Sequence, residues 1–394
     1  MFYGILDLPW WGYLVALLTL THITMASVTI YLHRHQAHRA LRLHPIISHF
    51  FRAWLWLTSG MNTKAWTAIH RKHHAKCETD ADPHSPKIYG ISTVLLEGAE
   101  LYKREACNKE TLERYGQGTP DDWLEHNLYT PHSRMGVITM LVINILLFGV
   151  PGITIWAMQM IWNPLFAAGV INGIGHYWGY RNFECPDAAT NVLPWGFLIG
   201  GEELHNNHHT YPTSAKLSVK WFEFDIGWFY IQILAWLRLA KVKRVPPKPS
   251  IVLNKKQIDG DTLRALLSNQ IQIMTSYSKQ VTLPLFKMEK RNAKPAAQRL
   301  LKRMKSALFR ADILIDASDK QYLAQFLESN QVLQLVYNYG EQLKAIWNKH
   351  NATQKELLDA LHEWCRKAEA TGLQRLQEFS QYLKGYTIQS ATIA

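Results

Sequence analysis

The sequence has little cysteine, with only four in 394 residues. They lie far apart and form no C-x-x-C pair: Cys77, Cys107, Cys185 and Cys365. This spacing excludes a disulfide framework, a thiolate zinc ribbon and an iron–sulfur cluster. The sequence also lacks a G-x-G-x-x-G nucleotide fingerprint and an H-P-G-G haem-binding stretch. The chain therefore carries no motif for binding any of these redox cofactors.

Acidic residues are fewer than basic ones. The chain has 43 Lys and Arg against 31 Asp and Glu, which gives a net charge of +12. This excess favours anionic partners such as nucleic acid or acidic lipid headgroups. Two residue types are abundant, with 15 Trp and 18 His. Trp suits the headgroup level of a membrane, whereas so many His are either scattered polar residues or a metal site.

Three apolar segments predict membrane spans, near residues 12–32, 135–150 and 153–175. The first contains no formal charge and is long enough to cross a bilayer, which takes about 20 residues. The other two are separated by Pro151 and Gly152, which mark a turn. They therefore predict a transmembrane hairpin, and its second helix contains Asn163 and Pro164.

A fourth apolar segment, residues 46–60, has a different character. It is short for a span and contains His49 and Arg52 near its middle. We therefore expect a helix that lies in the interface or re-enters the membrane. The membrane domain is predicted over residues 1–244.

The rest of the chain is polar. Residues 245–250, VPPKPS, are typical of a Pro-rich linker. Residues 251–394 contain helical i, i+3, i+4 spacings of apolar residues, which predict a separate helical domain. Eight Lys and Arg between Lys287 and Lys305 form a basic run. This run is either a solvated helix face or a docking surface for an anionic partner.

The histidines are strongly clustered. They form an H-x-x-x-x-H box and two H-x-x-H-H boxes, at residues 33–38, 70–74 and 205–209. His176 stands alone, four residues after Asn172. In H-x-x-H-H the three imidazoles lie on one face of a helix. An incidental His-rich surface would not repeat compatible spacings three times.

Nine of these histidines are candidate metal ligands: His33, His38, His70, His73, His74, His176, His205, His208 and His209. Nine neutral imidazoles exceed what one tetrahedral zinc can use. They suit two first-row metal ions, because imidazole binds iron, zinc, copper and nickel. We interpret His35 as an extra member of its box and His84 as a loop or supporting residue.

The boxes can share a site only if they lie on one face of the membrane. This holds if residues 46–60 do not cross and the hairpin crosses twice, which predicts three crossings. The first 11 residues contain Asp7 and no Lys or Arg, whereas the box-bearing loops and the tail are basic. By the positive-inside rule the boxes are then cytoplasmic. The predicted fold is all-α: a membrane helical bundle with a cytoplasmic histidine-box cap, followed by a soluble helical domain.

The order of the boxes resembles that of the integral-membrane fatty acyl desaturases, a di-iron histidine-box superfamily. Two flanking runs sharpen the resemblance to the bacterial stearoyl-CoA Δ9 type. Residues 78–84, ETDADPH, look like the family's ETxADPH run, and residues 172–181 look like its NxxxHxxGYR run. The resemblance covers roughly residues 12–240.

The resemblance implies a set of site residues. Two iron ions would be held by the nine histidines named above, with Asn172 reaching one iron through water. The family's tunnel-end residues fall at Thr21 and Met25, twelve and eight residues before His33. The alternative is that these two side chains only pack or face lipid.

The resemblance also implies an activity and partners. The enzyme would use O2 to insert a cis double bond, at Δ9 by family type, into a saturated acyl chain carried on CoA or on membrane lipid. Because the chain lacks redox motifs of its own, electrons would come from a separate ferredoxin or flavin/iron–sulfur reductase. We expect an integral protein of the bacterial inner membrane, in contact with membrane lipid and with no nucleic-acid partner.

Two other functions stay open at the level of sequence. One is a di-iron membrane hydroxylase of alkanes or lipids, which shares the histidine pattern. The other is a His-rich metal transporter or store. A transporter would place its ligands at mid-span, whereas these lie at span ends and in loops.

Overall fold

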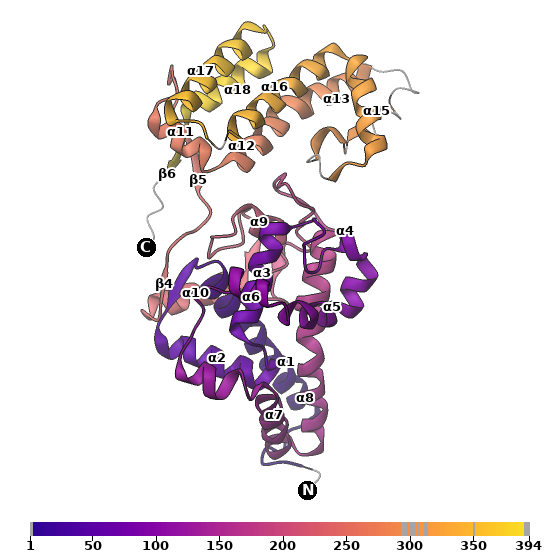
Figure 1. The fold of residues 1–394 in the computed structure, drawn as a ribbon, viewed down its shortest axis with the longest axis vertical. Helices are drawn as coiled ribbons and strands as arrows, with labels where there is room; N and C mark the ends of the chain where they lie inside the picture. The colour runs from indigo at the N-terminus through magenta and orange to yellow at the C-terminus, as the bar shows by residue number, and fades with distance from the viewer. Residues whose placement is uncertain are drawn as a thin grey trace. The chain divides into compact units, whose positions relative to one another are not determined.

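A computed structural model describes residues 3–292, 298, 301, 304, 305, 307–310, 314–349 and 351–389. The chain forms two compact units (Figure 1). The first holds Met1–Asn182 and Ala188–Pro246, and the second holds Phe183–Asp187 and Pro247–Ala394. The predicted domains did not separate Phe183–Asp187 from the membrane domain, because this segment has no linker-like composition.

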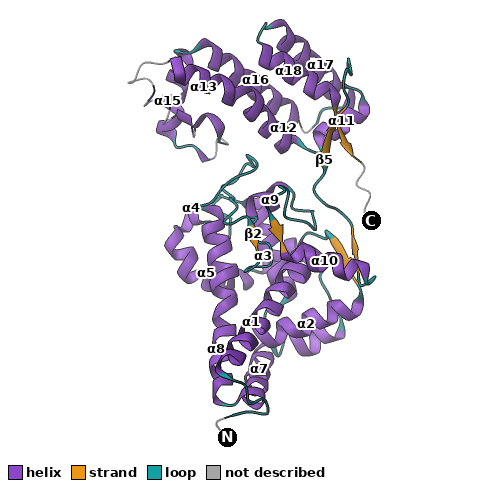
Figure 2. Ribbon diagram, turned by 180° about the vertical axis from the view of Figure 1, so that it is seen from behind, coloured by secondary structure: helices purple, strands orange, loops and turns teal. Residues whose placement is uncertain are grey.

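The described chain is helical, as the sequence predicted, and Figure 2 shows how little strand it contains. Its strands are short: β1 (Leu41–Leu43), β2 (Trp195–Gly196), β3 (Phe224–Asp225), β4 (Ala240–Val242), β5 (Lys248–Ile251) and β6 (Tyr386–Gln389). β1 pairs antiparallel with β4, β2 parallel with β3, and β5 antiparallel with β6. Residues 248–250 of the predicted linker therefore belong to a strand. Pro249 is tolerated there because both strands of a two-stranded ribbon are edge strands.

The first apolar helix is longer than predicted. It consists of α1 (Trp10–Ser27) and the π-helix η1 (Val28–Ala37), which continue as one run of 28 residues. The predicted span covered residues 12–32 because that segment contains no formal charge. The box instead extends the helix, so His33 is held on a rigid element.

A second long run holds α8 (Val150–Asn163), the π-helix η3 (Pro164–Ile171) and the 3-10 turn η4 (Ile174–His176). Pro164 does not break it. A proline removes one backbone donor and crowds the preceding turn, and the wider π-helix accommodates both effects. The run Val150–His176 spans 27 residues.

The remaining predicted span, residues 135–150, is shorter than these two helical runs. It forms α7 (Ser133–Phe148), whose 16 residues extend about 24 Å, less than a hydrocarbon core of about 30 Å. Among the described residues two helices are long and apolar enough to cross a membrane, α7 is a shorter apolar helix, and its crossing stays a prediction. α7 packs against α8, which also contacts α1 (Figure 1).

The segment predicted to lie in the interface forms α2 (Pro45–Ser59). It exposes Ile46 and Phe50 and buries Arg52, which pairs with Asp122 and Glu125. The other helices of the first unit are α3 (Thr63–Lys76), α4 (Pro86–Tyr89), α5 (Ile91–Ala106), α6 (Lys109–Tyr115), η2 (Glu125–Tyr129), α9 (His205–Thr210) and α10 (Ile226–Trp236).

The second unit is a helical bundle with a core of its own. Its described helices are α11 (Gly260–Leu267), α12 (Gln270–Tyr277), η5 (Ser278–Thr282), α13 (Leu283–Asn292), α15 (Ala317–Glu328), α16 (Gln331–Trp347), α17 (Gln354–Ala370) and α18 (Gln374–Gly385). Leu266, Leu333 and Phe379 are fully buried. Of the basic run, Lys294, Arg299, Lys302 and Arg303 lie outside the described residues.

Candidate metal centre

Four helical elements bring the histidines together. η1 carries His33 and is capped by His38, α3 carries the second box, η4 ends at His176, and α9 begins at His205. α3 begins at the N-cap Asn62, whose side chain accepts a hydrogen bond from the backbone N–H of Ala65. The three boxes, far apart in the sequence, therefore meet in the first unit.

Five histidines form a first cluster, here called group one: His33, His38, His70, His74 and His208. Their Nε2 atoms face one another at close range. The distance is 3.0 Å from His33 to His208, 2.8 Å from His38 to His70 and 2.8 Å from His74 to His208.

The other four candidate histidines form group two: His73, His176, His205 and His209. The Nε2 atom of His176 lies 3.1 Å from that of His73 and 2.9 Å from that of His205. The His209 ring lies 4.5 Å from the His205 ring, measured between centroids. Cys77 lies at the edge of this group, with its Sγ 3.9 Å from the Nε2 of His73.

Carboxylates hold the rings of both groups from behind. In group one Glu202 accepts from the Nδ1 of His33 at 2.7 Å. In group two Asp82 accepts from His73 at 2.9 Å, and Glu78 accepts from His176 at 3.1 Å. A hydrogen bond at Nδ1 fixes the tautomer and leaves the lone pair at Nε2.

These lone pairs decide whether the donor set fits a metal. His73 and His176 both give their Nδ1–H to a carboxylate, so two Nε2 lone pairs face each other across 3.1 Å. They repel unless a cation lies between them. Metal–nitrogen bonds of about 2.1 Å at right angles separate ligand nitrogens by about 3.0 Å. The residues present therefore fit a metal ion.

Burial favours the neutral form of six of the imidazoles. Burial, followed by the charges of neighbouring rings, holds the pKa of four group-one histidines well below 6.5: His38, His70, His74 and His208. Burial acts in the same way on the pKa of His205 and His209. Burial alone would raise the pKa of the Asp82 carboxyl, but the adjacent His73 outweighs it and the pKa is lowered. Neutral imidazole is the form that binds metals.

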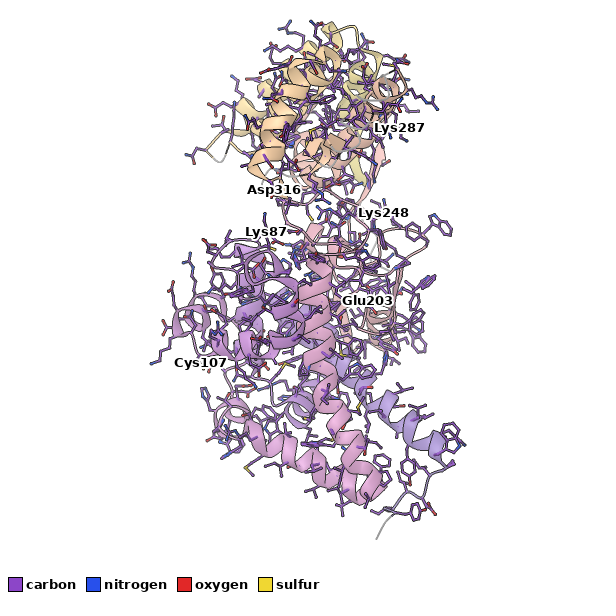
Figure 3. All side chains as sticks on the ribbon, turned by 90° about the vertical axis from the view of Figure 1, so that its right-hand side faces the viewer. Lys87, Cys107, Glu203, Lys248, Lys287 and Asp316 are labelled. Atoms are coloured by element: carbon purple, nitrogen blue, oxygen red, sulfur yellow. The ribbon has the colours of Figure 1, made fainter. Side chains whose placement is uncertain are left out.

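Sequence reasoning missed the residues that position the boxes. Arg34, between two box-one histidines, donates to Asp225 and to the carbonyl of Gly200, and both side chains are buried. Glu203, labelled in Figure 3, accepts from the backbone N–H groups of Ile199 and Gly201 and so folds the loop before the third box. Arg34 could have been found only as a charged residue inside an apolar helix.

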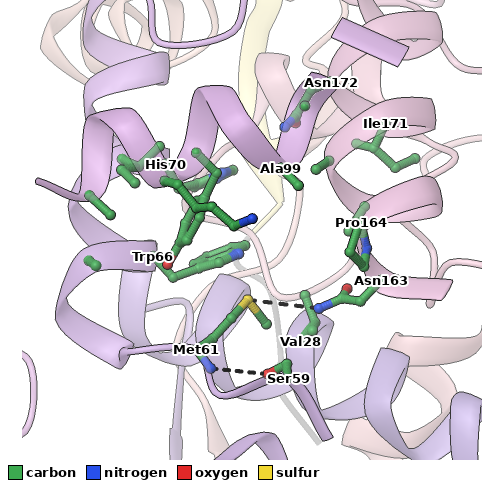
Figure 4. A pocket seen from close by; sticks show the side chains of 18 of the residues that line it. Val28, Ser59, Met61, Trp66, His70, Ala99, Asn163, Pro164, Ile171 and Asn172 are labelled. Carbon is green, nitrogen blue, oxygen red and sulfur yellow. Dashed lines mark hydrogen bonds between the residues drawn. The ribbon is translucent and has the colours of Figure 1, made fainter. Parts of the chain in front are cut away.

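A cavity of about 560 Å³ reaches the histidines (Figure 4). His33, His70 and His205 line it, and so do Asn172 and Met25. His84 also lines it, and its ring lies 4.5 Å from that of His73. Thr21 does not line it, because its hydroxyl is turned back to the carbonyls of Leu17 and Leu18.

Comparison with known proteins gives the family. A model described as fatty acid desaturase matches residues 8–228, more than half of the chain. The chain belongs to the fatty acid desaturase family. Membership makes it an oxidoreductase of lipid metabolism, and with two apolar helices of sufficient length it is a membrane protein. A second model, described as transposase, matches residues 273–390, in the second unit alone.

Several curated desaturases are similar to this chain. Delta-9 acyl-lipid desaturase 1 of Arabidopsis thaliana is 27% identical over 244 residues, which are 61% of this chain and 77% of that protein. Acyl-CoA 5-desaturase AL21 of Anemone leveillei is 30% identical, over 56% of this chain and 68% of that protein. The sn-2 palmitoyl-lipid 9-desaturase of Nostoc sp. (strain 36) is 32% identical, over 46% and 64%.

Proposed function

We propose that the chain uses O2 to insert a cis double bond, at Δ9, into a saturated acyl chain. The observation that supports this most directly is that two histidine groups adjoin one cavity. That cavity is lined by apolar side chains such as Met25, Ile171 and Ile199. An unactivated methylene held there would lie next to both groups. Two of the similar proteins are named for position 9 and one for position 5.

The nine histidines would hold two iron ions, one in each group, with Asn172 acting through water on the cavity side. Iron bound there would supply the oxidising power that side chains lack. The chain's own residues orient the imidazole ligands and exclude water from the site. Glu202, Asp82 and Glu78 hold imidazole rings, and the buried lining keeps water from the acyl chain.

The proposal includes a location and partners. We infer that the site lies at the cytoplasmic face of a bacterial inner membrane, because the loops that carry the histidine boxes are basic. A separate ferredoxin or flavin/iron–sulfur reductase would deliver electrons, attracted by the net charge of +12. The absence of a nucleic-acid partner stays a prediction, and the transposase match of residues 273–390 is the reason to test it.

The test is expression of the full chain in a bacterial host without desaturases, followed by mass spectrometry of its fatty acids with double-bond location. We expect a new double bond at position 9. A His208→Ala chain, produced at the same level, is the control and should give none. Hydroxylated instead of unsaturated lipid would favour the membrane hydroxylase. Unchanged lipids despite folded, iron-loaded protein would contradict both.

A further inference from the structure

The two ends of the cavity differ in exposure. Among its described lining residues, those near the metal centre are buried or half-buried, with His33, Glu202 and His205 buried. The exposed ones are Lys103, Arg134 and Pro164. The cavity therefore opens where these three lie and ends at the histidines.

Apolar side chains that are about half exposed lie next to the residues at the opening. On the long apolar run, Ile161 and Leu165 flank Pro164 and are 56% and 45% exposed. On α7, Met135 and Ile138 follow Arg134 and are 54% and 58% exposed. Exposed apolar residues on a membrane-spanning run face lipid. The opening is thus directed toward the bilayer.

Both charged residues at this opening are cations. The side chain of Arg134 has no hydrogen bond or ion pair with any other described residue. Lys103 pairs with Glu100 at 3.2 Å, but both side chains are more than half exposed, so the pair holds it weakly. Cations at the junction of apolar and polar surface lie at headgroup level, where they attract phosphate.

The lining next to Pro164 also contains a buried amide. Asn163, beside Pro164, is 8% exposed, and its Oδ1 has no hydrogen-bond partner among the described residues. A buried unpaired amide costs free energy unless a polar group meets it. Figure 4 shows Asn163 and Pro164 on the helical run that continues to Ile171 and Asn172. From Pro164 to His176 this run extends at most about 18 Å, a depth that an acyl chain spans and a headgroup does not.

We propose that the substrate is an acyl chain esterified to a membrane phospholipid, which enters the cavity sideways from the bilayer. Arg134 and Lys103 hold its phosphate, and the polar ester region lies near Asn163. The chain then extends inward to the histidines. This proposal rests on the proposed function. It selects phospholipid over CoA as the acyl carrier, because the opening faces lipid, whereas a soluble carrier is dissolved in water.

The test measures binding by the full-length protein in vesicles. The probe is a phosphatidylglycerol with a photoreactive diazirine in its acyl chain, with unlabelled phosphatidylglycerol and palmitoyl-CoA as competitors. We expect labelled peptides around Met25 and Ile171, competed by the phospholipid and not by palmitoyl-CoA. Lys103→Gln and Arg134→Gln should each weaken labelling about fivefold. Lys109→Gln and Arg114→Gln, which remove exposed cations outside the cavity, are matched controls.

Two outcomes would overturn the proposal. One is labelling that palmitoyl-CoA displaces and phosphatidylglycerol does not. The other is unchanged labelling in a folded Lys103→Gln, Arg134→Gln double variant. Failure of the proposed function looks different, because the host's fatty acids would then gain no double bond while phospholipid labelling remained. If the host gained new double bonds but palmitoyl-CoA displaced the label, the phospholipid proposal would fail and the proposed function would stand.

Discussion

Groups one and two are built from the same boxes but are held differently. Among the described residues, group one has five imidazoles and a carboxylate contact at one of them, from Glu202 to His33. Group two has four imidazoles, and two of them, His73 and His176, each give a hydrogen bond to a carboxylate. We infer that group one would hold a metal ion through the number of its rings, whereas group two would hold one through the fixed orientation of fewer rings.

The largest effect is expected from removing a single ring in either group. His70→Ala should lose the metal of group one and His205→Ala that of group two, so iron falls from about two ions per chain to about one. Double-bond formation should stop in both. Metal analysis of the purified chains checks this, with His126→Ala as a control outside both groups. Loss of both ions in each variant would show that the groups do not bind separately.

The next effect comes from the carboxylates. Glu202→Gln removes the one carboxylate of group one and should weaken its metal binding about 10–100-fold. Asp82→Asn should cost less in group two, because Glu78 still orients His176. Competition with a chelator measures both affinities. Equal losses would contradict the contrast drawn between the groups.

Acid should destabilise the metal-free chain. In the folded state burial keeps the pKa of His38 and His70 below 6.5, whereas the unfolded chain takes up protons as the pH falls through 6.5. The unfolded state then binds more protons, so stability falls with falling pH. Thermal unfolding between about pH 7.5 and 5.5 measures the slope. A His38→Gln, His70→Gln variant should show a shallower slope, and an unchanged slope would place the sensitivity elsewhere.

The smallest effect concerns chain length. Met25 lines the cavity and is buried, so Met25→Ala should admit a longer acyl chain with little loss of rate. Thr21→Ala is the matched control on the same helix, since Thr21 does not line the cavity. The fatty acid profile of the expression host reports both. A Met25→Ala profile identical to that of the unchanged chain would remove Met25 from the cavity end.

The sequence was sufficient to locate the boxes, because i, i+3, i+4 spacing is a local property of a helix. It could not divide the rings between two groups, which depends on how η1, α3 and α9 pack. The structure shows the rule: rings four residues apart, His70 with His74 and His205 with His209, join the same group. The helix through Pro164 was predicted, but its π-helical geometry at Pro164–Ile171 was not, since a π-helix is not visible in composition.

The second and third boxes each contain two histidines that are consecutive in the chain, His73 with His74 and His208 with His209, and each pair is divided between the groups. Consecutive Cα atoms are about 3.8 Å apart. The backbone therefore links the two groups covalently at two places, so their spacing does not depend on packing alone. Thermal motions of the fold can move both groups together, but they cannot easily increase the distance between the two groups.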